Sequence, residues 1–108
     1  MTLTLQQRFG ANATLSNGTL QIKLSDLTTA GLDATAPNAD QILASLILMS
    51  QQNQPTNVSE DPSVGVTITD SFKSFALRGE ESQLEYQKTV SFYVADSTSA
   101  IDPDDLVG

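Results

Sequence analysis

Three glutamates close together in the sequence are the first candidates for acid–base chemistry. Glu80, Glu81 and Glu85 lie in or beside a predicted hairpin turn. A pair of carboxylates can hydrolyse a glycosidic bond when one acts as acid and the other as base or nucleophile. A hairpin turn, however, is ordinarily a solvated place for charge, and a chain of 108 residues has little room for a sugar cleft flanked by carboxylates. The pattern therefore favours solvated charges over a catalytic pair.

Ser71 and Lys73 are the second candidate, because a serine beside a lysine can act as a nucleophile. This spacing arises easily in a serine-rich chain, and no glycine-bracketed turn surrounds Ser71. The chain also contains no histidine and no cysteine. It therefore lacks the commonest general base and any thiolate chemistry. We predict that the protein is not an enzyme and holds no cofactor.

Acidic residues near the C-terminus are the candidates for a metal site, since Ca²⁺ binds carboxylate oxygens. They are Asp96, Asp102, Asp104 and Asp105. Their spacing lacks the D-x-[DN]-x-[DN]-G pattern with a glutamate at the twelfth position. A solvated tail, or a tail that contacts a basic partner, is therefore favoured over a calcium site.

The charge balance bears on the class of partner. Thirteen acidic and five basic residues give a formal net charge of -8, which repels phosphate backbones and anionic lipid surfaces. The longest apolar stretch, residues 42–49, is far shorter than the roughly 20 residues of a membrane-spanning helix. No charged segment followed by a long apolar run marks a signal peptide. We expect a soluble protein, cytoplasmic or part of a virion, that binds neither nucleic acid nor membranes.

The main element expected is a helix over about residues 38–51. Asn38 is a suitable N-cap, and Gln41 stands three residues later at the capping-box position. One broad apolar face contains Ile42, Leu43, Leu46, Ile47 and Met49. Ala44 and Leu48 fall outside that face, so the helix is more apolar than packing on one sheet requires. Either the domain wraps this helix or a partner covers Leu48.

The remaining segments favour strands. Asn17-Gly18, flanked by leucines, predicts the tip of a hairpin. Residues 2–9 alternate weakly and are expected to form a first strand, and residues 64–68 alternate more clearly. Two further strands, near 71–78 and 84–95, should pair as a hairpin, with a bulge near Lys73 or Ser74 because Phe72 is out of step.

The elements together predict an α+β fold in which the helix at about 38–51 packs on a mostly antiparallel β-sheet of five or six strands. Residues 1–108 should form a single compact domain with an acidic C-terminal tail over about 96–108. Lys88, on the apolar face of the last strand, is expected near an edge where its charge reaches water.

The strongly apolar helix and the polar, lysine-poor strands favour packing against other chains. We expect a structural or assembly protein that forms a homo-oligomer or a subunit of a larger particle, such as a capsid-decorating or tail-associated virion protein. The residues predicted to face the partner are Leu48, Ala44, Tyr93, Ile101 and Leu106. The alternative is a small-ligand or carbohydrate-binding module with a pocket between helix and sheet.

Overall fold

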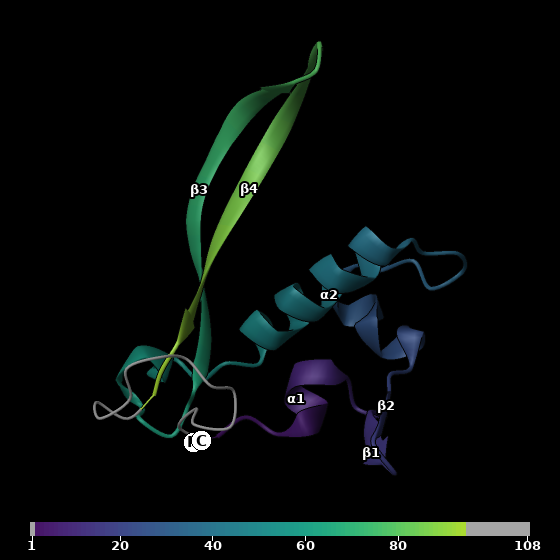
Figure 1. Ribbon diagram of the computed structural model, residues 1–108, viewed down its shortest axis with the longest axis vertical. Coiled ribbons are helices and arrows are strands. Elements are labelled where there is room, and N and C mark those ends of the chain that lie inside the picture. Colours follow the sequence, from purple (N-terminus) through teal and green to yellow (C-terminus); the bar gives the residue numbers. More distant parts are fainter. Residues whose placement is uncertain (1, 95–108) are drawn as a thin grey trace.

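A computed structural model describes residues 2–94. Helices and a short hairpin form a base, from which a long hairpin projects, and the molecule measures 47 × 31 × 26 Å along its principal axes (Figure 1). The elements in chain order are α1 (Leu5–Phe9), β1 (Thr14–Ser16), β2 (Thr19–Gln21), η1 (Leu24–Ala30), α2 (Ala39–Gln52), η2 (Val58–Glu60), β3 (Val66–Arg78) and β4 (Glu81–Phe92), where η denotes a 3₁₀ helix. Within residues 2–94, no helix is both long enough and apolar enough to cross a bilayer.

The first element is a helix, so the strand predicted over residues 2–9 is wrong. Thr4 is the N-cap of α1. Its hydroxyl accepts a hydrogen bond from the Gln7 backbone N–H at 3.1 Å, and the Gln7 side chain accepts one from the Thr4 backbone N–H at 2.8 Å. This capping box satisfies donors that the first turn of a helix leaves unpaired. Its stabilisation outweighs the weak alternation of apolar and polar residues in this segment.

Helix α2 confirms the predicted main helix and holds the core of the base. Asn38 and Gln41 form the expected capping box, with hydrogen bonds of 2.8 and 2.9 Å. Met49 packs with Leu27 of η1, which is fully buried, and with buried Leu32. The half-buried residues around this cluster are Ile22, Leu24, Ala30, Ile42 and Leu46. Because each buried leucine contributes about 1.5–3 kcal/mol, this cluster is the main apolar stabilisation of the base.

The predicted single sheet of five or six strands is wrong. The described residues form two separate two-stranded antiparallel sheets, β1–β2 and β3–β4. The first is the predicted hairpin, and both of its turn residues have positive φ, 51° at Asn17 and 74° at Gly18. The segments expected as separate strands at 64–68 and 71–78 largely merge into one strand, β3, which has β4 as its only strand neighbour among residues 2–94. Residues 2–94 therefore contain fewer strands than their alternating segments suggest.

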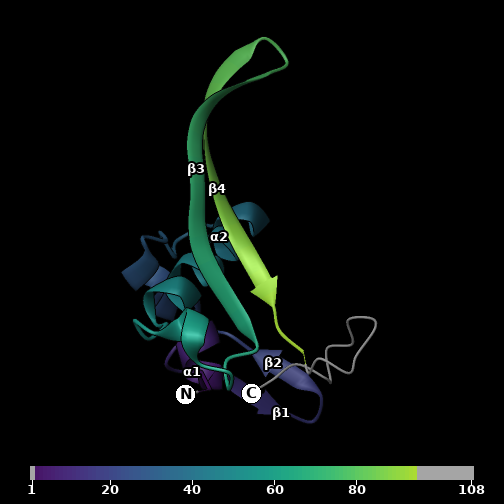
Figure 2. The ribbon, with the colours of Figure 1, turned by 90° about the vertical axis from the view of Figure 1, so that its left-hand side faces the viewer.

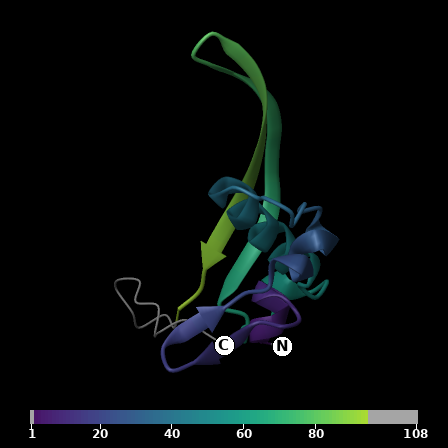
Figure 3. The same ribbon diagram turned by 90° about the vertical axis from the view of Figure 1, so that its right-hand side faces the viewer.

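We call the β3–β4 hairpin, residues 66–92, the arm. Its strands are joined by a two-residue loop, Gly79-Glu80, and φ at Gly79 is +64°, which suits a residue without a Cβ atom. The hairpin predicted between the last two strands is confirmed. In Figures 2 and 3 the outer part of the arm stands clear of α2 and of every other element in residues 2–94.

A bulge interrupts the arm close to its predicted position. The pairing register shifts between Asp70 and Lys73, so Ser71 and Phe72 of β3 together face Gln87 of β4. Such a bulge adds one residue to one strand and increases the local twist. The extra residue explains why Phe72 is out of step with Phe75 and Leu77. Strand β3 nevertheless continues through the bulge.

The base end of β3 is fastened to the helices by two long polar side chains. Arg8 of α1 donates hydrogen bonds to the Ser50 hydroxyl at 2.7 Å and to the Val66 carbonyl at 2.6 Å, and burial lowers the pKa of its guanidinium. The Gln54 side chain accepts from the Ile68 backbone N–H at 2.7 Å and donates to the Ile68 carbonyl at 2.8 Å. Gln54 thus bonds to β3 as a neighbouring strand would.

Replacing Gln54 by alanine is expected to lower the free energy of unfolding by roughly 1–3 kcal/mol, because the N–H and C=O of buried Ile68 lose their partner. Urea denaturation followed by circular dichroism measures the change. Gln52→Ala is the matched control, since Gln52 is exposed at the end of α2. Equal stability of the two variants would show that water replaces the Gln54 amide without cost.

Candidate functional site

The glutamates considered as acid–base candidates lie around the outer end of the arm. Glu80 is in the turn, and Glu81 and Glu85 are exposed on one face of β4. None of the three lines either cavity described below. Glu85 accepts a hydrogen bond from Gln87 at 3.2 Å. The structure therefore places these carboxylates in solvent, as their position in a turn indicates, and forms no two-sided cleft around them.

The structure also separates the serine–lysine pair. The Ser71 hydroxyl is hydrogen-bonded to the Thr89 hydroxyl. The ammonium group of Lys73 lies instead over the ring of Tyr86, 5.3 Å from its centre, which is a cation–π contact. Lys73 is thus engaged by an aromatic ring and does not activate the serine.

The register of the arm sorts its side chains into two chemically different faces. Residues directly opposite each other in an antiparallel pair point to the same side. One side, which we call the apolar face, carries Val66, Ile68, Phe75, Leu77, Leu84, Tyr86, Val90 and Phe92, together with the polar residues Asp70, Lys73, Ser82 and Lys88. The other, which we call the polar face, carries Thr67, Thr69, Ser74, Gln83, Glu85, Gln87, Thr89 and Ser91. A sheet with one apolar face is stable in water when another layer covers that face.

Helix α2 is too short to supply that layer over the whole arm. At a rise of about 3.3 Å per residue, strand β3 is roughly 43 Å long, since it has 13 residues. At about 1.5 Å per residue, helix α2 is roughly 21 Å long, since it has 14 residues. The outer half of the arm consequently has no cover within residues 2–94. There, Phe75 is 81%, Leu77 75% and Tyr86 66% exposed.

The uncovered surface is large for a protein of this size. Phe72, beside the bulge, is 73% exposed and Phe92 is 53% exposed. With about 200 Å² for each aromatic side chain, these two together with Phe75 and Tyr86 leave on the order of 500 Å² of apolar surface in water. Leu77, Leu84 and Val90 add to it. The largest apolar patch on an ordinary monomer is about 300–600 Å² and is often functional, so the apolar face is the strongest candidate for an interaction surface.

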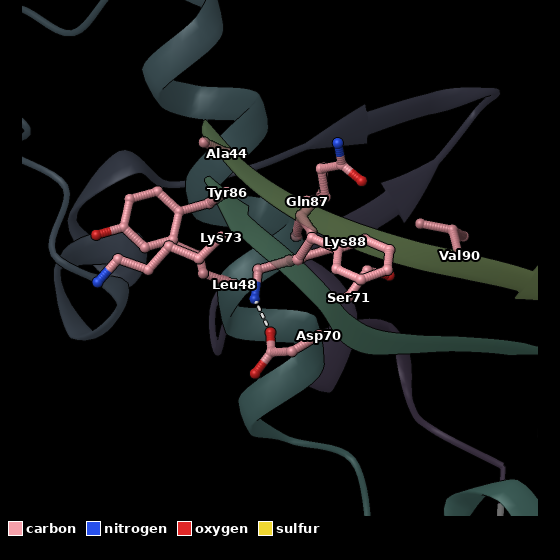
Figure 4. Close-up of a pocket in the computed structure, with 11 residues that line it drawn as sticks. Ala44, Leu48, Asp70, Ser71, Lys73, Tyr86, Gln87, Lys88 and Val90 are labelled. Atoms are coloured by element: carbon pink, nitrogen blue, oxygen red, sulfur yellow. Dashed lines mark hydrogen bonds and ion pairs between the residues drawn. The ribbon is translucent and has the colours of Figure 1, made fainter. Parts of the chain in front are cut away.

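A cavity of about 920 Å³ lies between α2 and the arm (Figure 4). We call it the groove. Its lining residues are Ala44, Ile47 and Leu48 of α2 and Asp70, Ser71, Phe72, Lys73, Tyr86, Gln87, Lys88 and Val90 of the arm. Ala44 and Leu48, two of the predicted partner-facing residues, therefore line the same hollow, where Ala44 is exposed and Leu48 half-buried. That a partner covers them stays a prediction.

One polar cluster connects the arm to α2 at the groove. The Lys88 ammonium donates to Asp70 Oδ1 at 2.5 Å and to Gln51 Oε1 at 2.6 Å, and the Gln51 side chain also donates to Asp70 at 3.3 Å. The Lys88 side chain is 24% exposed, so its charge is held by these partners and is less open to water than predicted. The hydrogen bond from Lys88, then that from Gln51, then the charge of Lys88 lower the pKa of the Asp70 carboxyl.

The lowered pKa of Asp70 predicts how stability depends on pH. Because the pKa of Asp70 is lower in the folded than in the unfolded protein, its contribution is present above the unfolded value and is lost as pH falls through the folded value. We expect Asp70→Asn to lower the melting temperature at neutral pH and to make no difference near about pH 2. Thermal denaturation of both proteins across this range measures the effect. A constant difference at all pH values would contradict it.

The other predicted partner-facing residues lie elsewhere. Tyr93 follows β4 in the base, where its backbone N–H donates to the Gly65 carbonyl at 2.9 Å and its hydroxyl is 3.4 Å from that of Thr67. It lines a smaller cavity of about 290 Å³, away from the groove. Ile101 and Leu106 lie outside the described residues, as does the acidic tail at 96–108. Of the three predicted residues that are described, Ala44 and Leu48 share the groove and Tyr93 lines the other cavity.

The described part of the chain forms no metal site from clustered side chains. Among residues 2–94, no group of three or more Asp, Glu, His or Cys side chains is arranged to hold a metal ion.

Comparison of the chain with protein-family models, with curated proteins and with solved structures finds no match. Proposals on function therefore rest on the geometry and chemistry of the arm and the groove.

Proposed function

We propose that this protein is a non-enzymatic assembly protein whose arm docks on another protein chain, in a homo-oligomer or as a subunit of a larger particle. The observation that carries this proposal is the exposed apolar face of the arm, with Phe75, Leu77 and Tyr86 all more than half exposed. An isolated two-stranded hairpin is at best marginally stable in water. The arm therefore gains stability from a partner that covers its apolar face.

The magnitude of the hydrophobic effect is compatible with stable association. Removing about 500 Å² of apolar surface from water is favourable by about 12 kcal/mol. Association costs an estimated 4–15 kcal/mol in lost translational and rotational freedom. The apolar face alone can therefore offset much of that cost. The polar face, which is rich in Thr, Ser and Gln, can hydrogen-bond across subunits without removing many charges from water.

A virion is one setting that suits these properties, with the protein acting as a capsid-decorating or tail-associated subunit. The support for that setting is the composition of the chain, which has few basic residues and no cysteine or histidine, together with a projecting arm that a neighbouring subunit can cover.

Size-exclusion chromatography with light scattering, over a series of protein concentrations, tests the proposal on the chain alone. We expect a defined oligomer whose mass fraction rises with concentration. A monomer at every concentration would contradict self-assembly and would make the alternative below the better proposal.

The groove supports a second candidate function, binding of a small ligand or carbohydrate. Its volume of about 920 Å³ falls in the range of roughly 300–1,000 Å³ that is typical of ligand pockets. Tyr86 offers an aromatic wall, and Lys88 and Asp70 offer polar groups at its side. Thermal shift against a panel of sugars and small apolar molecules tests this function, since a bound ligand raises the melting temperature.

A further inference from the structure

The two edges of the arm differ in how far they are open to another strand. Along β3, Gln54 bonds both the N–H and the C=O of Ile68, and Arg8 bonds the carbonyl of Val66. Further out, the bulge at Ser71 and Phe72 distorts the same strand. Covered backbone groups and bulges are both features that block the addition of a strand at a sheet edge. The edge of β3 that faces away from β4 is therefore protected over residues 66–72.

Residues 2–94 give the outer edge of β4 no such protection. Because Ile68 directs its backbone groups away from the arm, to Gln54, the pair Ile68–Val90 exchanges no hydrogen bond. By alternation, the even-numbered residues of β4 then turn their N–H and C=O groups outward. Within residues 2–94, no hydrogen bond to those backbone groups is present. Strand β4 runs from Glu81 to Phe92 without proline and without an extra residue of its own.

We propose that two copies of this chain pair through their β4 edges, antiparallel and about a twofold axis at Gln87, to form one four-stranded sheet. The order of strands in this sheet is β3, β4, the partner's β4 and the partner's β3. The inference depends on the proposed assembly function and names its partner, a second copy. The pairing satisfies a row of backbone groups that is otherwise open, and it widens a two-stranded hairpin, which is marginal alone, into a sheet of four strands.

The register follows from the faces and the charges of β4. Directly opposite residues share a face, so pairing even with even positions keeps the two apolar faces continuous. An axis at Glu85 or at Lys88 would place two like charges directly opposite, which is destabilising. An axis at Gln87 avoids this, sets Tyr86 opposite the partner's Lys88, and sets Leu84 opposite the partner's Val90.

An axis at Tyr86 also avoids opposed like charges, but it sets Leu84 opposite the partner's Lys88. Because a leucine packs better against a valine than against an ammonium group, Gln87 is the better centre. In this arrangement the tip of each arm lies beside the base end of the other arm. The exposed leucines of the tip thus come close to the partner's groove, where Val90 is part of the lining.

Single cysteines test this geometry, since the chain has no cysteine of its own. In Gln87→Cys, the two introduced residues face each other across the axis as a pair without hydrogen bonds, with Cα atoms about 4.5 Å apart, a separation that a disulfide spans. In Glu85→Cys, on the same face, the two residues are about 13 Å apart, which is too far. Ser74→Cys is the control for the β3 edge.

Each full-length variant is oxidised by air at a concentration where light scattering shows the oligomer, and non-reducing electrophoresis measures the crosslinked fraction. We expect at least about ten times more crosslinked dimer for Gln87→Cys than for the other two variants. Crosslinking at Ser74→Cys instead would assign the interface to β3 and overturn the inference. An oligomer without any crosslink would overturn it and leave the assembly function standing. A monomer at every concentration would overturn both this inference and the homo-oligomer form of the assembly function.

Discussion

The double replacement of Phe75 and Leu77 by aspartate is expected to abolish association through the apolar face and to leave the dimer that pairs through β4 as the largest species. The two side chains are adjacent on the apolar face and are the most exposed apolar residues in the described part of the chain. Covering each is worth about 1.5–3 kcal/mol, so the loss of both weakens association by at least about 100-fold, and the added carboxylates resist burial. Sedimentation equilibrium gives the association constant of both proteins.

A matched control separates the apolar face from a general effect of charge. Ser74→Asp with Gln83→Asp adds the same two charges to the polar face of the arm, at exposed positions on β3 and β4. We expect this control to keep its association constant within about ten-fold of the natural protein. If the control dissociates as completely as the apolar-face variant, the loss of assembly comes from repulsion between chains that already carry -8 each, and the docking role of the apolar face is wrong.

Leu27→Ala is expected to lower the free energy of unfolding by about 2–5 kcal/mol. Leu27 is fully buried and packs with Leu32 and Met49 in the cluster that joins η1 to α2. Its truncation leaves a cavity in a base that has little other apolar core in the described residues. Since marginal domains have only about 5–15 kcal/mol in total, this single change removes a large share of the stability. Urea denaturation measures it.

The control for this second prediction is Leu15→Ala. Leu15 has the same side chain but is 68% exposed on β1, so its truncation should change stability by no more than about 0.5 kcal/mol. Similar losses at Leu15 and Leu27 would contradict the view that the base depends on the cluster around α2. The association constant of Leu27→Ala, measured where the protein is still folded, should equal that of the natural protein, because Leu27 lies in the base and the interface lies on the arm.

Local features of this chain could be predicted from the sequence because they depend on neighbours in the chain. The capping box of Asn38 and Gln41 starts α2, and the Asn17-Gly18 turn closes β1 and β2. The same rule identifies α1, where Thr4 and Gln7 have capping-box spacing. In residues 2–9 this capping-box signal competes with a weak alternation of apolar and polar residues, which favours a strand. Short segments of either kind are hard to distinguish by periodicity alone.

The number of strands in the sheet could not be predicted, because alternation shows that a segment is extended and not how many partners it has. Phe75 and Tyr86 stand in the phase that a buried face requires, so the pattern alone favours a core position for both, although both are exposed. A comparison of the lengths of the strand and the main helix explains this exposure. A strand rises roughly 3.3 Å per residue and a helix roughly 1.5 Å per residue. Strand β3, which continues past residue 70, is therefore about twice as long as helix α2. One helix cannot cover it.

The candidate site was predicted only in part for the same reason. Ala44 and Leu48 could be predicted because they are apolar residues outside the broad apolar face of the helix. Both line the groove. The larger apolar surface on the arm was missed, because its exposure depends on the absence of a second layer in space. Burial is a property of tertiary structure, and in this protein the local pattern of a core strand and that of a docking strand are identical.

In the proposed assembly, the glutamine that bonds along β3 also limits the number of copies that can join edge to edge. A sheet with two open edges can add copies at both sides without end, which leads to filaments. With Gln54 and the bulge on one side, β4 is the one edge of the arm in residues 2–94 that is open along its whole length, and one pairing event uses it up. The Gln54 side chain therefore blocks the addition of another strand beside Ile68. It makes strand addition stop at two copies and leaves further growth to the joined apolar faces.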